Sequence, residues 1–391
     1  MQSFEHASPE LRLFCGGQSL SRLPQELARA GSRRAFVVCG ASVAGGAALP
    51  LLVDSLGASY AGHFAGAKAH SPLPTVEQAA RAMREAGADA VIALGGGSAI
   101  VTARAANILL AEGGDLRALC TSRGADGKLS SPRLNAAKLP QFVVPSTPTT
   151  ALAKAGSAVL DPATGHRLAL FDPKTRARAV FVHPAVLASA PASLVRGASL
   201  NALAMAVEGL ESAARTPMAD ADLVHALRLL SAGLPLLGTP GCNDDTLAQL
   251  VVAALLCGRG TDQAGGGLAS VLGHAIGPRS SVANGIVNAI VLPHTLRFNA
   301  PATVGRVDAV SAALGVADRG AGERDAAAQA VAAIEALLAR LPIPRRLRDA
   351  GVAREDFEAI ADEARQDWFL SRNPRPVEGR AELLALLEAA W

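Results

Sequence analysis

The chain has 391 residues, of which 50% are hydrophobic and 18% charged, so a large core spread over about two domains is expected. Its 37 basic and 34 acidic residues leave a net charge of +3 without a basic cluster, which argues against nucleic-acid binding. With no apolar run of the ~18 residues a membrane helix needs, no signal-peptide features and five scattered cysteines, we expect a cytoplasmic protein that does not bind membranes.

The first half of the chain alternates short apolar runs with amphipathic segments. Residues 35–40 (AFVVCG), 90–94 (AVIAL) and 141–144 (QFVV) predict buried parallel strands, because each run is apolar and leads into glycine or proline. Apolar positions recur at helical spacing in 76–86 and 98–110. This alternation predicts an α/β domain whose parallel sheet is covered by helices on both faces.

Beyond about residue 190 the pattern changes to long stretches rich in alanine and leucine. These stretches predict the helices of a second, all-α domain: 197–213, 218–236, 244–258, 324–341 and 380–390. We therefore place the two domains at 1–188 and 189–391. Within the first domain, the polar residues 121–139 predict a surface loop.

A glycine turn, Gly95-Gly96-Gly97-Ser98, stands between a predicted strand and a predicted helix. Glycines let the backbone approach a phosphate closely, and the start of a helix offers N–H groups and a positive dipole end. The sequence is not GxGxxG, and a tight turn without a ligand explains it equally well. The turn alone therefore leaves both interpretations open.

A second loop, PSTPTT at 145–150, follows the third predicted strand and is rich in hydroxyl groups. Such loops at the carboxyl ends of parallel strands commonly line a ligand crevice. An ordinary turn rich in proline and threonine is the alternative. Two loops of this kind after strands of one sheet strengthen the case for a bound nucleotide.

Several segments, in order, resemble one family. They are LGGGSAIVTARAANILL, VVPSTPTTA, DPATGHRLAL, LNALAMAVEGLES, GHAIG, ANGIVNAIVLPHTLRFNAP and the terminal NPRPVEGRAELLALLEAAW. Together they resemble the iron-containing (group III) alcohol dehydrogenases, which are related in fold to dehydroquinate synthase. Within that group, NALA at 201–204 and the NPRPV motif are most similar to the maleylacetate reductases.

The resemblance implies a dinucleotide-binding α/β domain, a helical domain, an active site in the cleft between them and a homodimer. It also implies that NAD(P)H is the cofactor, bound by Gly96, Gly97 and Ser98 at the pyrophosphate and by Thr147, Thr150 and Arg167 elsewhere. Arg167 stands where the family usually has lysine. Gly40 stands where NAD-preferring members often have an acid, so the choice between NADH and NADPH stays open.

The chain departs from the family at the metal site. The family holds a divalent metal with an aspartate and three histidines, and those positions here are Asn201, Met205, Ser270 and Asn284. A thioether matches Fe²⁺ or Zn²⁺ poorly, and neutral amide and hydroxyl groups are weak ligands. We therefore expect no metal ligands and no tightly bound divalent metal.

Three other side chains are candidates for the chemistry. The resemblance aligns His274 with a family histidine that is not a metal ligand and can relay a proton. Lys154 follows the hydroxyl-rich loop and could face the nicotinamide, while Arg279 could grip a carboxylate in bidentate fashion. A buried structural histidine, a surface lysine and a rim arginine are the alternatives.

The leading hypothesis is therefore a metal-independent NAD(P)H-dependent reductase of a small oxo acid or aldehyde, with a carboxylate-bearing substrate. A non-redox lyase, isomerase or dehydratase working by acid–base catalysis is a second hypothesis. A catalytically inactive homologue is a third. Binding of the dinucleotide discriminates the first hypothesis from the other two.

Overall fold

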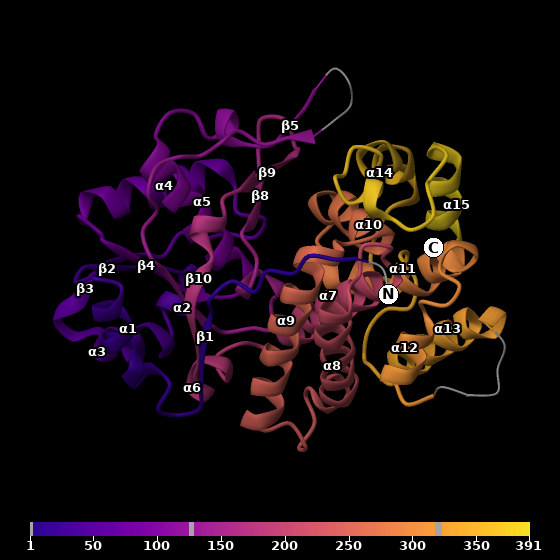
Figure 1. Cartoon of the computed structure of the whole chain (residues 1–391), viewed down its shortest axis with the longest axis horizontal. Coiled ribbons are helices and arrows are strands. Elements are labelled where there is room, and N and C mark those ends of the chain that lie inside the picture. The colour runs from indigo at the N-terminus through magenta and orange to yellow at the C-terminus, as the bar shows by residue number, and fades with distance from the viewer. Residues whose placement is uncertain (1–2, 125–128, 317–322) are drawn as a thin grey trace. The chain divides into compact units, whose positions relative to one another are not determined.

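The computed structural model describes residues 3–124, 129–316 and 323–391. The chain divides into two compact units (Figure 1). One unit comprises Ala7–Pro191, and the other comprises Ala192–Trp391 together with the described residues up to His6. In the described part of the chain, no helix is both long and apolar enough to span a membrane.

The Ala7–Pro191 unit is built on a six-stranded sheet in which all neighbouring strands are parallel. In spatial order the strands are β1 (Arg12–Cys15), β10 (Ala177–Val182), β7 (Gln141–Pro145), β4 (Ala90–Gly95), β2 (Ala35–Val38) and β3 (Tyr60–Phe64). The predicted α/β fold with a parallel sheet is confirmed. The three predicted strands are the central strands β7, β4 and β2.

These central strands form because every residue in them is buried, so continuous apolar runs suit both faces of the sheet. The helices of the unit are α1 (Leu23–Arg29), α2 (Ala41–Ala44), α3 (Ala48–Leu56), α4 (Leu73–Glu85), α5 (Gly97–Glu112) and α6 (Pro184–Leu187). Leu23 and Leu52, from α1 and α3, pack on one face of the sheet against Ile92. Helix α5 packs against β4 and α4.

Two antiparallel hairpins accompany the sheet. One pairs β5 (Ser122–Arg123) with β6 (Leu129–Ser130), within the stretch predicted as a surface loop, of which residues 125–128 lie outside the described part of the chain. The other pairs β8 (Gly156–Leu160) with β9 (Arg167–Phe171). It turns tightly at Gly165, whose φ of +74° favours glycine.

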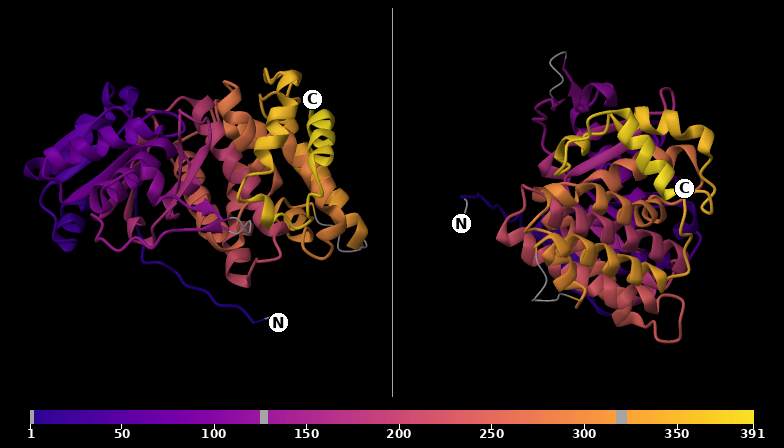
Figure 2. Two further views of the ribbon diagram at one scale, coloured as in Figure 1. Left: turned by 90° about the horizontal axis from the view of Figure 1, so that it is seen from above. Right: turned by 90° about the vertical axis from the view of Figure 1, so that its right-hand side faces the viewer.

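The second unit is helical, which confirms the predicted all-α domain (Figure 2). Its helices are α7 (Ala192–Glu211), α8 (Pro217–Gly233), α9 (Asp244–Ala264), α10 (Leu268–Ile276), α11 (Asn284–Asn299), α12 (Asp308–Ala313), α13 (Glu323–Ala339), α14 (Phe357–Ala364) and α15 (Arg380–Ala390). Helix α7 packs against α8, α9, α10 and α11, and is mostly buried.

Helices α7, α10 and α11 approach one another unusually closely. A Cβ atom added at Gly285, in the first turn of α11, would lie 1.8 Å from the Gly197 carbonyl oxygen of α7. A Cβ atom at Gly273 of α10 would lie 1.9 Å from Asn288 Oδ1. Only glycine permits these contacts, so the α11 backbone approaches that of α7 closely at Gly285, and the Asn288 side chain packs directly against Gly273 of α10.

Candidate functional sites in the two units

The glycine turn lies where β4 passes into α5, and the described residues provide no side-chain cap for this helix. A Cβ atom added at Gly96 would lie 2.8 Å from Thr147 Oγ1, and one at Gly97 would lie 3.1 Å from Thr149 Oγ1. The threonine hydroxyls therefore pack directly against the glycine backbone, where a larger residue would collide with them. The first N–H groups of the helix point out of its positive end, which suits a phosphate group.

The hydroxyl-rich loop follows β7, the direct neighbour of β4 in the sheet. The Ser146 N–H donates to the Gly95 carbonyl oxygen at 3.0 Å, which joins the two loops at the carboxyl edge of the sheet. Thr147 and Thr150 are buried in this loop, while Ser98 is half-buried at the start of α5. The structure thus brings the two predicted cofactor segments together.

Two further predicted positions belong to the same unit. Gly40 follows β2, the next strand after β4, and a Cβ atom there would lie 3.2 Å from the Ala67 carbonyl oxygen. Arg167 opens β9 and pairs with Leu160 of β8 in the second hairpin. Its role at a cofactor stays a prediction.

Lys154 lies in a short segment held by two arginines that the sequence did not single out. Arg104, fully buried on α5, donates to the carbonyl oxygens of Ala151 at 2.8 Å and Gly156 at 2.6 Å. Arg176 donates to the Ala153 carbonyl oxygen at 2.6 Å. The segment bearing Lys154 is therefore fixed from both sides by charged hydrogen bonds. An arginine within an otherwise apolar helix was the available signal for Arg104.

In the helical unit, two of the four positions where the family has metal ligands, Asn201 and Met205, are occupied by side chains that contact each other. Asn201 Nδ2 lies 3.7 Å from Met205 Sδ, one turn further along α7. The Asn288 amide of α11 lies 3.1 Å from Asn201 Oδ1. These neutral groups are thus joined in a network between α7 and α11.

Ser270 is hydrogen-bonded to a buried carboxylate. Its Oγ donates to Glu208 Oε2 at 2.5 Å and its N–H donates to Glu208 Oε1 at 2.8 Å. Burial raises the pKa of Glu208, and the hydrogen bonds from Ser270 and from the backbone at Gly267 and Ala269 act in the opposite direction. Glu208 therefore caps the start of α10 from a neighbouring helix.

These residues do not fit a divalent transition metal. Thioether, amide and hydroxyl groups replace the anionic and imidazole donors that such ions prefer, and the Ser270 hydroxyl already donates to Glu208. Throughout residues 3–124, 129–316 and 323–391, no three His, Cys, Asp or Glu side chains are grouped as metal ligands.

His274 lies one turn after Ser270 and forms a pair that the sequence did not predict. Its Nδ1 lies 2.7 Å from Asp367 Oδ2, and its ring contacts Trp368 and Phe369 at centroid distances of 5.7 and 5.5 Å. Because a carboxylate only accepts hydrogen bonds, the Nδ1 atom of His274 carries a hydrogen in this pair. The His274 side chain is 19% exposed, so the pair is neither fully buried nor free in solvent.

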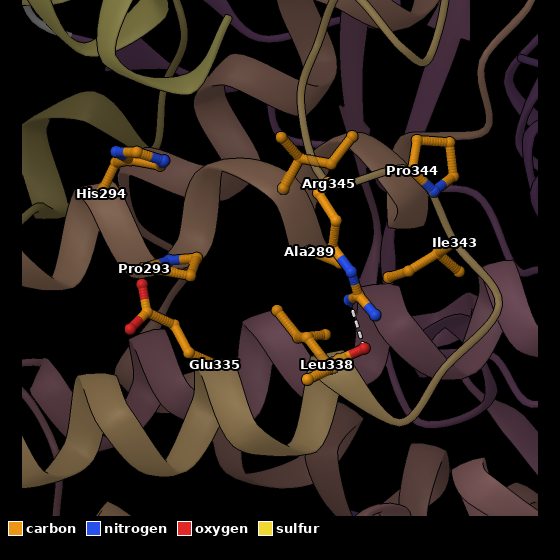
Figure 3. A pocket seen from close by; sticks show the side chains of 10 residues that line it. Ala289, Pro293, His294, Glu335, Leu338, Ile343, Pro344 and Arg345 are labelled. Carbon is orange, nitrogen blue, oxygen red and sulfur yellow. Dashed lines mark hydrogen bonds between the residues drawn. The ribbon is translucent and has the colours of Figure 1, made fainter.

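Arg279 ends the 3-10 helix Gly277–Arg279 after α10 and is exposed. His294, the histidine of the LPH motif, lies instead at one end of a separate pocket of about 270 Å³ between α11 and α13 (Figure 3). Burial lowers the pKa of His294. Glu335 lies beside it, and Arg345 at the other end of the pocket donates to the Leu338 carbonyl oxygen.

Comparison with known proteins accounts for both units. The family model for iron-containing alcohol dehydrogenase matches residues 9–184, and the model for the C-terminal part of the Fe-containing alcohol dehydrogenase family matches 197–391.

Lactaldehyde reductase of Escherichia coli (strain K12) is 26% identical over 381 residues, which are 96% of this chain and 97% of that protein. Maleylacetate reductase 2 of Cupriavidus pinatubonensis (strain JMP 134 / LMG 1197) is 31% identical over 385 residues, with coverages of 97% and 94%. The crystal structure of 1,3-propanediol oxidoreductase superposes with a TM-score of 0.91 at 24% identity, with 100% of each chain covered. The chain therefore belongs to the iron-containing alcohol dehydrogenase family.

Proposed function

We propose that the chain is an NAD(P)H-dependent reductase of a small oxo acid or aldehyde that works without a bound metal. The observation that carries this proposal is the His274–Asp367 pair, since it offers a proton donor beside positions that no longer suit a metal. The named relatives are oxidoreductases, and a maleylacetate reductase is among them. A carboxylate-bearing substrate is consistent with that relative.

The cofactor fits the turn at the start of α5. Gly96 and Gly97 bring the backbone close to the hydroxyl groups of Thr147 and Thr149, and the first N–H groups of α5 can bind the pyrophosphate. When bound, the nicotinamide supplies a hydride to the carbonyl carbon of the substrate. The fixed segment around Lys154 follows the same loop and presents a cation in this unit.

His274 is proposed to donate the proton. Reduction of a carbonyl group would build negative charge on its oxygen, and this charge must be stabilised. The imidazole of His274, which Asp367 orients through Nδ1, is the proposed donor of a proton to that oxygen. Lys154 and Arg279 are proposed to supply the positive charge that a metal provides elsewhere, with Arg279 binding the carboxylate of the substrate.

The test is steady-state oxidation of NADH and NADPH by chelator-treated enzyme, with maleylacetate and short 2-oxo acids as substrates. We expect turnover without metal, and a fall in kcat of about 10²–10⁴-fold in His274→Ala. Asp367→Asn should also lower kcat and shift its dependence on pH, because the amide no longer accepts from Nδ1. Asp349→Asn, which changes an exposed aspartate of the same unit, is the matched control.

A different result would refute each part of the proposal. Loss of turnover after chelation, with recovery on adding Fe²⁺ or Zn²⁺, would refute metal independence but keep the reductase. Undiminished turnover of His274→Ala would remove this residue from the mechanism. Failure of the folded protein to bind either nucleotide would favour the non-redox enzyme or the inactive homologue.

A further inference from the structure

A second pocket in the Ala7–Pro191 unit lies away from the glycine turn. It has a volume of about 520 Å³ and is lined by residues at the amino ends of three adjacent strands. Arg12 opens β1, Ala177 opens β10 and Phe142 lies near the start of β7. The glycine turn follows the carboxyl end of β4, at the opposite edge of the same sheet. The length of β7 from Gln141 to Pro145, at ~3.3 Å per residue, already places these two edges of the sheet ~13 Å apart.

The pocket has a strong positive charge. Five basic side chains line it, namely Arg12, Arg29, Lys174, Arg176 and Arg178, against the two acidic side chains Glu10 and Glu26. Five positive charges less two negative charges leave a formal charge of +3. The whole chain also has a net charge of only +3, so basic residues are concentrated here.

Part of this positive charge is held in place by the fold. Glu26 is only 4% exposed, and its Oε1 lies 3.7 Å from an Arg12 nitrogen and 3.5 Å from Arg29 Nε. Each guanidinium carries five N–H donors, so both retain donors beyond those that face Glu26. Lys174 Nζ is likewise held, 3.2 Å from Asp172 Oδ1 and 2.7 Å from the Leu134 carbonyl oxygen. The side chains are therefore partly ordered before any ligand binds.

We propose that this pocket binds a small polyanion that carries at least two phosphate or carboxylate groups. Arginine forks bind both groups in bidentate fashion, and the charge of +3 favours a ligand with several negative charges. The volume lies in the range of about 300–1,000 Å³ that is usual for sites of small molecules. The site is independent of the proposed reductase activity, because it uses none of the residues assigned to cofactor or substrate.

Arg176 links this pocket to another part of the unit. It lines the pocket and also donates to the Ala153 carbonyl oxygen, next to Lys154. Replacing it would therefore disturb both places, and it is left unchanged in the test. Lys174 and Arg178 are the better choices, since both are exposed.

The experiment is calorimetric titration of the full chain with inorganic tripolyphosphate and, separately, with citrate, at low ionic strength. We expect one binding site, whose affinity falls about tenfold or more in Lys174→Gln/Arg178→Gln, since charged hydrogen bonds are lost. The control is Arg81→Gln/Arg84→Gln, which removes two exposed charges from α4 in the same unit. It should bind as the wild type does. The preferred anion, tripolyphosphate or citrate, identifies phosphate or carboxylate as the group recognised.

Three results would overturn the proposal. The first is absence of binding for both anions in the folded protein. The second is an equal loss of affinity in the control, which would mean that anion binding depends only on the overall charge of the protein. The third is loss of binding in Gly96→Ala with full binding in Lys174→Gln/Arg178→Gln, which would move the polyanion to the glycine turn.

Discussion

Glu211 allows a test of how burial in this fold changes the pKa of a carboxyl group. It lies on α7, one turn after Glu208, and both carboxyl groups are buried. Burial raises the pKa of Glu211 well above its usual range, and the neighbouring Glu208 raises it further. Asn299 and Arg306 act in the opposite direction without cancelling this shift. The folded protein therefore keeps a proton on Glu211 at pH values where the unfolded chain has lost it.

The expected effect follows from this difference in bound protons. Between the ordinary glutamate pKa of ~4.3 and the higher folded pKa, the folded state binds more protons than the unfolded state. The free energy of unfolding then falls by about 1.4 kcal/mol for each unit that the pH rises. Glu211→Gln cannot ionise and resembles the protonated acid in shape. We expect this variant to lose that part of the dependence on pH.

Urea unfolding between about pH 5 and pH 8 measures the slope. The chain has two tryptophans, Trp368 and Trp391, and both lie in the helical unit with Glu211, so their fluorescence reports this unit. Glu358→Gln is the control, because the Glu358 side chain is 62% exposed. Parallel slopes for wild type and Glu211→Gln would show that Glu211 is ionised in the folded protein, and would refute the reasoning.

Two further predictions follow from the Ala7–Pro191 unit. Gly96→Ala places a methyl group 2.8 Å from Thr147 Oγ1 at the proposed pyrophosphate site, so the Kd for NADH should rise about tenfold or more. Gly17→Ala, which has open space around it, should bind normally. Equal binding by both variants would argue against the glycine turn as the pyrophosphate site. Burial raises the pKa of Cys39 and of Cys120 to about 11. Neither thiol should therefore react with a thiol reagent at pH ~8 until urea unfolds the protein. The exposed Cys15 should react at once. Rapid labelling of Cys39 or Cys120 in the folded protein, detected by peptide mapping, would contradict this.

The sequence predicts the parts of the fold whose residues are buried on both sides. β2, β4 and β7 are continuous apolar runs because helices cover both faces of the sheet. The edge strand β3 is only half-buried, so it has no such run to reveal it. In β10 the exposed Arg178 is the second residue, so only its last four residues form a continuous apolar run.

Of the candidate sites, the two loops of the Ala7–Pro191 unit can be predicted from the sequence, whereas the side-chain pairs of the helical unit cannot. The two loops after β4 and β7 can be predicted to meet, because carboxyl ends of adjacent parallel strands share one edge of a sheet. The pairs in the helical unit cannot be predicted, because they join residues far apart along the chain. Ser270 and Glu208 are separated by 62 residues, and His274 and Asp367 by 93. Tertiary packing alone brings these partners together.

The contacts of Gly285 with α7 and of Gly273 with Asn288 have a consequence for protein engineering. The contact at Gly285 involves only backbone atoms of α7, so this close approach of α11 to α7 does not use the side chains at the four positions of the family's metal ligands. A redesign with Asn201→Asp, Met205→His, Ser270→His and Asn284→His would place four metal donors on this scaffold and would remove the hydrogen bond of the Ser270 hydroxyl to Glu208. The same frame could then be compared with and without an ion, which would isolate what the metal contributes to catalysis in such enzymes.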